Sequence, residues 1–247
     1  MKVIQILPEL SSGGVERGTL ELADHLVRSG HESIVISGGG RLVEILERSG
    51  STHLKMPVGK KSLGSLRLIT PLRKLFTEQR PDIIHLRSRV PAWLAWWAWQ
   101  KLPTGNRPGL VTTVHCFYSV IRWSEIMCCG ERIICVSDSI KQYVVENYPR
   151  ADDTKLRVVP RGVSPSDYPF GFRADLDWRN RFEEQFPEIR GKKLLTLPGR
   201  ITRLKGHEDL IRIMKSLPSD LNIHALIVGG THPRKTAYFE ELKGKVE

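Results

Sequence analysis

The chain has 247 residues, a formal net charge of +11 and a pI of about 9.7. Hydrophobic residues make up 40% and charged residues 26%, a balance that predicts a packed globular interior and excludes a disordered chain. The basic excess favours an anionic partner, namely nucleotide phosphate, acidic lipid or nucleic acid, without choosing among them.

Strand-like and helix-like segments alternate along the first two thirds of the chain. The apolar run that follows Met1 ends at Pro8, which is too short for a secretory signal. Apolar positions at helical spacing begin at Val15 and stop at Gly30. Strands are predicted at 2–7, 33–37, 82–85, 110–114, 132–136 and 156–159, and further helices at about 65–79, 90–101, 120–128 and 138–148. This rhythm predicts parallel strands joined by crossover helices, with helices on both faces of the sheet.

The rhythm breaks at 160–190, which is rich in proline, and then restarts. Strands are predicted at 193–197 and 225–228, and helices at 206–217 and 234–246. The fold class is therefore α/β: a doubly wound parallel-sheet (Rossmann-like) domain plus an incomplete second Rossmann-like domain. The expected boundaries are 1–165 for the acceptor-side domain, 166–189 for a linker and 190–247 for a partial nucleotide-sugar-binding domain. A complete second domain would need on the order of 100–150 residues, so we expect a truncated C-terminal domain.

Two loops carry features suited to binding phosphate. The first is Ser12–Gly18, where Gly13 and Gly14 join a strand end to a helix start, although a tight turn needs glycine in any case. It lacks the G-x-G-x-x-G spacing, and no acid follows the second strand to hold a ribose, which disfavours a nicotinamide-dependent oxidoreductase. The second loop places Arg200 and Lys205 before a helix, where two cations and a helix dipole can neutralise a departing diphosphate. A solvated basic loop is the alternative.

Two more candidates follow predicted strands. His115 stands at the end of a buried strand, which would face the ligand crevice, although a lone histidine is more often structural. Arg161 offers a cation at the domain junction, or belongs to a plain surface turn.

Six motifs in order resemble glycosyltransferase family 4, whose members have two Rossmann-like domains facing across a cleft. They are Gly13-Gly-Val-Glu-Arg17, Asp82-Ile-Ile-His85-x-x-Ser88, Thr113-Val-His115, Val136-Ser137-x-Ser139, Val158-Val-Pro-Arg-Gly-Val163 and Gly199-Arg200-x-x-x-x-Lys205-Gly206. The resemblance implies a retaining, metal-independent transferase that takes a nucleotide-diphosphate sugar as co-substrate and needs no cofactor. Its acceptor would be a glycan or lipid-linked glycan of the cell-envelope or lipopolysaccharide type. Nucleic acid is not an expected partner.

The resemblance also implies residue roles. His115 would contact the donor sugar, while Arg200 and Lys205 would hold the diphosphate. The donor and acceptor cleft would include Gly13, Gly14, Ser137, Arg161 and Glu208. Two departures stand out: Cys116 replaces the glycine usual after the cleft histidine, and no pair of glutamates matches the family's Glu-x(7)-Glu motif. A catalytically inactive fragment or acceptor-binding module is therefore an alternative, and a nucleotide-sugar epimerase a weaker one.

The remaining features concern metals and membranes. Cys116, Cys128, Cys129 and Cys135 form no C-x-x-C pair, and Asp175-Leu-Asp177 lies in the expected linker, so no metal site is predicted. Residues 55–80 offer a basic face to anionic lipid, with a solvated face as the alternative. The tryptophan-rich run 93–99 predicts a helix buried against the sheet. No apolar run reaches the roughly 20 residues of a membrane span, so we expect a cytoplasmic protein, soluble or peripheral on the inner membrane face.

Overall fold

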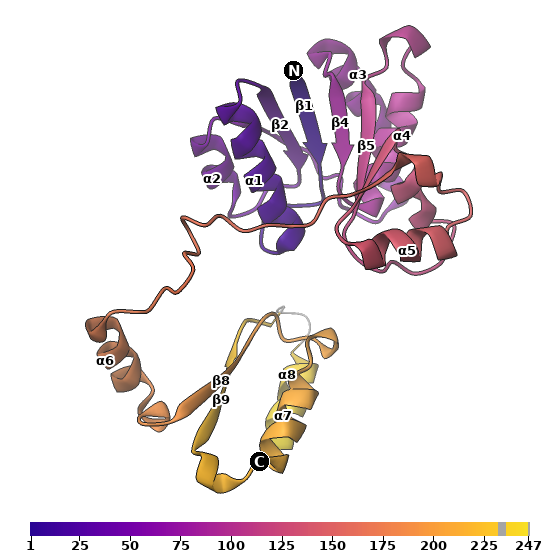
Figure 1. The fold of residues 1–247 in the computed structure, drawn as a ribbon. Helices are drawn as coiled ribbons and strands as arrows, with labels where there is room; N and C mark the ends of the chain where they lie inside the picture. Colours follow the sequence, from indigo (N-terminus) through magenta and orange to yellow (C-terminus); the bar gives the residue numbers. More distant parts are fainter. Residues whose placement is uncertain (232–235, 247) are drawn as a thin grey trace. The chain divides into compact units, whose positions relative to one another are not determined.

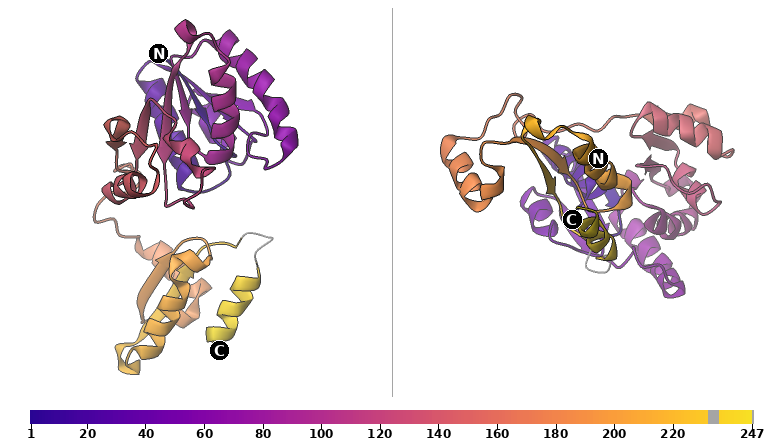
Figure 2. Two further views of the ribbon diagram at one scale, coloured as in Figure 1. Left: turned by 90° about the vertical axis from the view of Figure 1, so that its right-hand side faces the viewer. Right: turned by 90° about the horizontal axis from the view of Figure 1, so that it is seen from below.

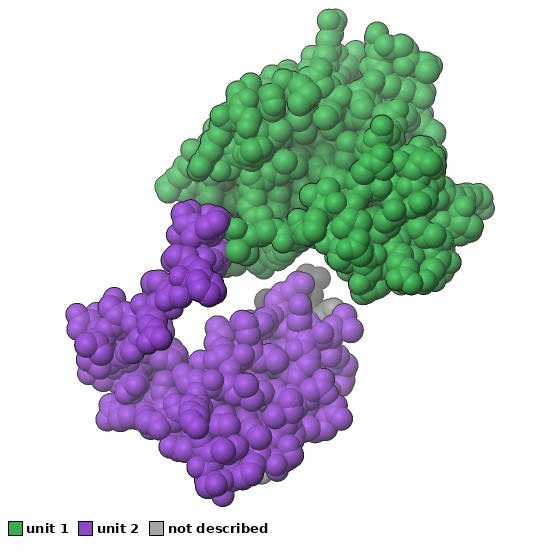
Figure 3. All heavy atoms as spheres, viewed as in Figure 1, with its two compact units in different colours: residues 1–163 green, residues 164–247 purple. Residues whose placement is uncertain are grey.

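The computed structural model describes residues 1–231 and 236–246. They form two compact units, residues 1–163 and residues 164–247, coloured separately in Figure 3. Among the described helices, none has the length and apolarity that crossing a bilayer requires.

Unit 1 (residues 1–163) is built on a parallel sheet with the order β3-β2-β1-β4-β5-β6-β7 (Figure 1). Neighbouring strands are in register, so that Ile4 of β1 pairs with Ile34 of β2 and with Ile84 of β4. The strands are β1 (Lys2–Ile6), β2 (Glu32–Ser37), β3 (Thr52–Lys55), β4 (Ile83–Leu86), β5 (Gly109–Val114), β6 (Arg132–Cys135) and β7 (Leu156–Val158).

Helices cover both faces of this sheet. They are α1 (Gly14–Arg28), α2 (Val43–Arg48), α3 (Ile69–Gln79), α4 (Arg89–Gln100) and α5 (Asp138–Asn147). Ile34 and Ile36 pack in the large apolar core with α3, α4 and α5, whereas Val35 between them packs with α1 and α2. This alternation is what a strand buried on both faces requires.

Helix α4 packs on the sheet through its small side chains. Ala92, Ala95 and Ala98 are fully buried, whereas the tryptophans between them are only partly buried. The small residues let the helix approach the sheet closely, and the indoles keep part of their surface exposed. Trp93 stacks on Trp123 with ring centroids 5.1 Å apart, and its Nε1 donates a hydrogen bond to the Trp123 carbonyl.

Unit 2 (residues 164–247) contains a two-stranded parallel sheet, β8 (Lys193–Pro198) and β9 (Ile223–Val228). Helices α7 (His207–Ser216) and α8 (Ala237–Val246) lie on the same side of it (Figure 2). Helix α6 (Leu176–Gln185) precedes the strands, and Asp175 caps it by accepting a hydrogen bond from Trp178 N at 2.7 Å. Asp175 thus has a structural task as an N-cap.

The structure confirms the α/β class and the expected sequence of parallel strands. The helix expected at 120–128 is wrong, because only a 3₁₀ turn forms at Ser124–Cys128. Helix α2 and strand β3 were not anticipated, since they follow a glycine-rich loop and are only 6 and 4 residues long. The helix expected at 234–246 is observed from Ala237, and its first positions, 234 and 235, lie outside the described residues.

Candidate functional site

The candidate residues of unit 1 lie where its strands end. Strands β1 and β4 are neighbours, and the chain leaves them in opposite directions, towards α1 and towards α4. Such a switch point opens a crevice at the carboxyl ends of a parallel sheet. His115 follows β5 and Ser137 closely follows β6, so the topology brings the predicted residues of unit 1 to one edge of the sheet.

His115 lies half-buried in a pocket of about 270 Å³ at this edge. Neither ring nitrogen has a hydrogen-bond partner among the described residues. Burial, together with the positive charges of Arg87 and Arg161, lowers the pKa of His115 to about 3. The imidazole is therefore neutral near pH 7, and it can donate one hydrogen bond and accept another.

The glycine loop has the conformation that its sequence predicts. Gly13 has φ +140° and caps the N-terminus of α1, and a Cβ added at Gly13 would lie 2.6 Å from Glu16 Oε2. Glycine is therefore needed at this position. The Glu16 carboxylate already lies beside the helix N-terminus, at the place where the phosphate-binding hypothesis puts an anion.

Ser137 acts as the N-cap of α5. Its Oγ accepts a hydrogen bond from Ile140 N at 3.2 Å. This bond satisfies one of the free amides of the first helical turn and fixes the direction in which the chain leaves β6.

Arg161 belongs to a segment that crosses the carboxyl ends of the strands. After β7, the outermost strand of the sheet, the chain runs towards α1 (Figure 1). Nη1 of Arg161 lies 3.6 Å from the position that a Cβ on Gly14 would occupy. Arg161 thus contacts the predicted glycine loop.

Arg87 and His85 were missed as site residues by the sequence reasoning. Arg87, directly after β4, is only 6% exposed and donates a hydrogen bond from Nη1 to Gln5 Oε1 at 3.0 Å. His85, buried on β4, pairs through Nε2 with Thr113 Oγ1 at 2.7 Å. The available signal was their alternation with the apolar Ile84 and Leu86 at the end of a buried strand.

The loop of unit 2 holds both predicted cations at the surface. Arg200 and Lys205 are exposed, and they lie between β8 and the N-terminus of α7. Gly199 has φ +152°, and a Cβ added there would lie 3.8 Å from Lys205 Cδ. Gly206, with φ +75°, then starts α7. The aliphatic stem of Lys205 thus packs beside the residue that precedes Arg200.

Glu208 belongs to an ion-pair network within unit 2. Its two carboxylate oxygens accept hydrogen bonds from Arg203 Nη1 and Lys245 Nζ, each at 3.0 Å. Glu241 bonds the same two cations, so the network connects the loop to α7 and α8. The roles assigned to His115, Arg200, Lys205 and the cleft residues remain predictions, because these side chains divide between the two units.

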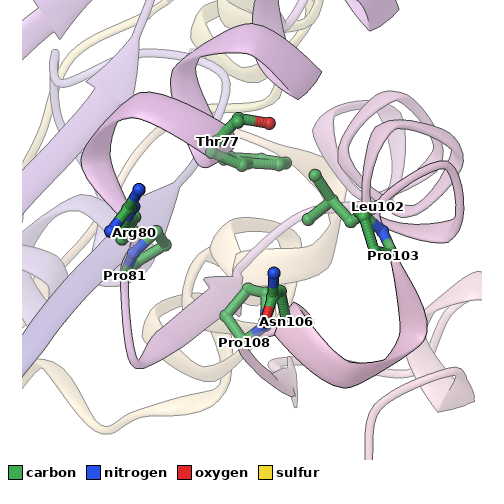
Figure 4. A pocket seen from close by; sticks show the side chains of 8 residues that line it. Thr77, Arg80, Pro81, Leu102, Pro103, Asn106 and Pro108 are labelled. Atoms are coloured by element: carbon green, nitrogen blue, oxygen red, sulfur yellow. The ribbon is translucent and has the colours of Figure 1, made fainter.

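A second cavity of unit 1, of about 380 Å³, lies at the other edge of the sheet (Figure 4). Pro81 and Pro108, which precede β4 and β5, line it together with Thr77, Arg80 and Asn106. Among the residues that line it, Arg80 is the one cation and none is a histidine, unlike the pocket at the carboxyl ends of the strands.

The topology of unit 1 defines a doubly wound, Rossmann-like parallel-sheet fold. The sequence model of Glycosyltransferase Family 4 matches residues 12–167. The chain belongs to this family.

The similar proteins agree with that assignment. An uncharacterised glycosyltransferase of Methanocaldococcus jannaschii is 25% identical over 93% of this chain and 62% of its own length. The crystal structure of a glycosyltransferase from Rickettsia africae ESF-5 is similar with a TM-score of 0.82 and 29% identity, over 99% of this chain and 64% of that one. Anabaena HepE, in complex with UDP and glucose, has a TM-score of 0.79 at 16% identity, over 100% and 66%. The chain thus spans under two thirds of the length of the first two.

Proposed function

We propose that this protein is part of a retaining glycosyltransferase. It moves a sugar from a nucleotide-diphosphate donor to a glycan or lipid-linked acceptor of the cell-envelope or lipopolysaccharide type. The observation that carries the proposal is the loop between β8 and α7, where Arg200 and Lys205 are exposed beside a helix N-terminus. Two cations and a helix dipole there stabilise the negative charge of a departing nucleoside diphosphate without a metal.

The remaining catalytic contribution is orientation. Neutral His115 can accept a hydrogen bond from a sugar hydroxyl or donate one to it, and the oxocarbenium-like character of glycosyl transfer makes such positioning effective. A structurally similar protein is known in complex with UDP and glucose, which supports a nucleotide sugar as the donor.

The first test uses calorimetry to measure the binding of UDP, GDP and ADP to the 247-residue chain. At least one nucleotide should bind, and Arg200→Ala or Lys205→Ala should weaken that binding about tenfold or more, since each removes a charge-assisted hydrogen bond. Lys215→Ala, an exposed lysine at the far end of α7, serves as the control and should change nothing. Equal binding by all variants would refute the assignment of this loop.

We also propose that a basic apolar surface of unit 1 rests on anionic lipid. Here Lys60 and Lys61 flank a pocket of about 490 Å³ that Trp93, Trp97 and Trp123 line, and Leu63 beside it is 87% exposed. Apolar side chains that enter the headgroup region next to lysines are typical of peripheral binding. The chain should co-sediment with vesicles of phosphatidylglycerol, and the double variant Lys60→Glu with Lys61→Glu should stay in the supernatant.

A further inference from the structure

Two arginines of unit 1 meet above a single glycine of α1. A Cβ added at Gly18 would lie 2.2 Å from Arg161 Nη2 and 3.2 Å from Arg87 Nη2. Gly14, one turn earlier, has Arg161 Nη1 at 3.6 Å from the same imagined position. Both guanidinium groups therefore share the space that Gly18 leaves open, and Arg161 also extends over Gly14.

The two positive charges form no close ion pair within the described residues, although the negative charge of Glu21 acts on Arg87 and partly offsets the lowering of its pKa. No ion pair found there at 4.0 Å or less involves Arg87 or Arg161. Nη1 of Arg87 bonds the neutral Gln5 amide, and its buried Nε has no acceptor. Burial and then the charge of Arg161 lower the pKa of Arg87 to about 10. Two like charges held together out of water repel each other, and a bound anion would reduce that electrostatic cost.

The space beside the two arginines is shaped as a binding site. The pocket of about 270 Å³ is several times the ~30 Å³ of a water molecule, and His85, Thr113 and His115 form part of its lining. The unpartnered ring nitrogens of His115 provide a further donor and acceptor, because this imidazole is neutral. Glu21 also lines the pocket, without closing an ion pair to Arg87 or Arg161.

We propose that Arg87 and Arg161 bind a phosphate or carboxylate group of the acceptor substrate. The inference rests on the proposed function, which assigns the donor diphosphate to Arg200 and Lys205 of unit 2. The lining of the pocket comes from unit 1, and the inference assigns it the anionic group of the acceptor because the donor diphosphate is already assigned to unit 2. Guanidinium groups suit this task because their planar arrays of N–H donors match phosphate and carboxylate oxygens in pairs. The acceptor is therefore an acidic glycan or a phosphate-bearing lipid-linked glycan.

The test titrates inorganic phosphate into the 247-residue chain, with the Cε1 protons of ¹³C-labelled histidines as the readout. Phosphate should shift the His115 signal, and the bound anion should raise the pKa of His115. Arg87→Gln and Arg161→Gln should each weaken binding about tenfold or more. Arg73→Gln, an exposed arginine of α3, is the matched control and should bind as the wild type does.

Two more variants separate geometry from charge. Gly18→Ala keeps both arginines but places a methyl group in the space of the Arg161 guanidinium, so it should weaken phosphate binding. Arg87→Lys keeps the positive charge at this buried site and should bind phosphate more tightly than Arg87→Gln. It therefore serves as a control for loss of binding that is caused by unfolding. Wild-type affinity in both Arg87→Gln and Arg161→Gln would overturn the proposal.

Binding of nucleoside diphosphates distinguishes this inference from the proposed function. If the Arg87 and Arg161 variants lose phosphate but keep nucleotide, the acceptor assignment stands. If they lose nucleotide as strongly as phosphate, the pocket takes the donor diphosphate and the acceptor assignment fails. If only Arg200→Ala loses nucleotide, the loop assignment stands whatever the phosphate result.

Discussion

Similar apolar strands are buried to very different extents in the two units. In unit 1, β1 (Lys-Val-Ile-Gln-Ile) has four of its five residues buried, because helices cover both faces of the sheet. In unit 2, β8 (Lys-Leu-Leu-Thr-Leu-Pro) is mostly exposed, with Leu194 at 42% and Leu195 at 38%. An apolar run thus predicts a strand, but its burial depends on what packs against it. Unit 1 supplies a preformed pocket, and unit 2 supplies an exposed loop.

The largest effect on stability should come from shortening a buried strand side chain in unit 1, and the same kind of change in unit 2 should have little effect. Ile84→Ala empties a fully buried position of β4 and should lower the free energy of unfolding of unit 1 by about 2–5 kcal/mol. Leu195→Ala in β8 removes a partly exposed side chain and should cost unit 2 less than about 1 kcal/mol. Urea unfolding can be followed by tryptophan fluorescence for unit 1, which holds every tryptophan except Trp178. Equal losses would remove the contrast between the units.

Protonation of His115 should weaken unit 1 as the pH falls. The folded pKa is about 3 and the unfolded value is near 6.5, so between these values the unfolded chain binds a proton that the folded chain does not. Stability from this group is complete above about pH 6.5, and about 2 kcal/mol of it is lost by pH 5. Urea midpoints at pH 7 and pH 5 measure the change. His115→Gln should reduce it, and an unaltered pH dependence in that variant would contradict the burial of a neutral imidazole.

Removal of a helix cap should have a smaller effect than the change at Ile84 or the protonation of His115, and it should again differ between units. Ser137→Ala loses the hydrogen bond to Ile140 N and should destabilise unit 1 by about 1 kcal/mol, because α5 packs on the core through Ile140 and Val144. Asp175→Ala loses the matching bond to Trp178 N in α6, which has no buried residue. It should reduce the helical circular dichroism signal without shifting the unfolding of unit 1. A shift in the second variant would show that α6 is coupled to that core.

Most of the fold was predictable because buried parallel strands are apolar on both faces. The runs 33–37 and 110–114 were correctly read as strands, since they are short and rich in the β-branched residues that favour strands. The pair α2 and β3 was not, because elements of 6 and 4 residues are too short to show a period. At 120–128, apolar residues at helical spacing gave only a 3₁₀ turn, in which Ser124 and Ile126 are buried.

The candidate site was predictable in part. His115 and Arg161 could be named as candidates because each follows a predicted strand. Arg87 was not, although it lies in one of the six motifs, because its importance depends on Arg161 lying beside it. That approach depends on the glycines at 14 and 18, and a single sequence does not show which arginine lies over them.

The division of ligands between the units can be measured directly in histidine-labelled protein. UDP, which lacks the donor sugar that would be transferred, should shift the signal of His207 at the start of α7 and leave His115 unchanged, whereas inorganic phosphate at low concentration should do the reverse. That result would support a donor-binding loop in unit 2 and an anion pocket in unit 1. A UDP shift confined to His115, with His207 unmoved, would contradict the account.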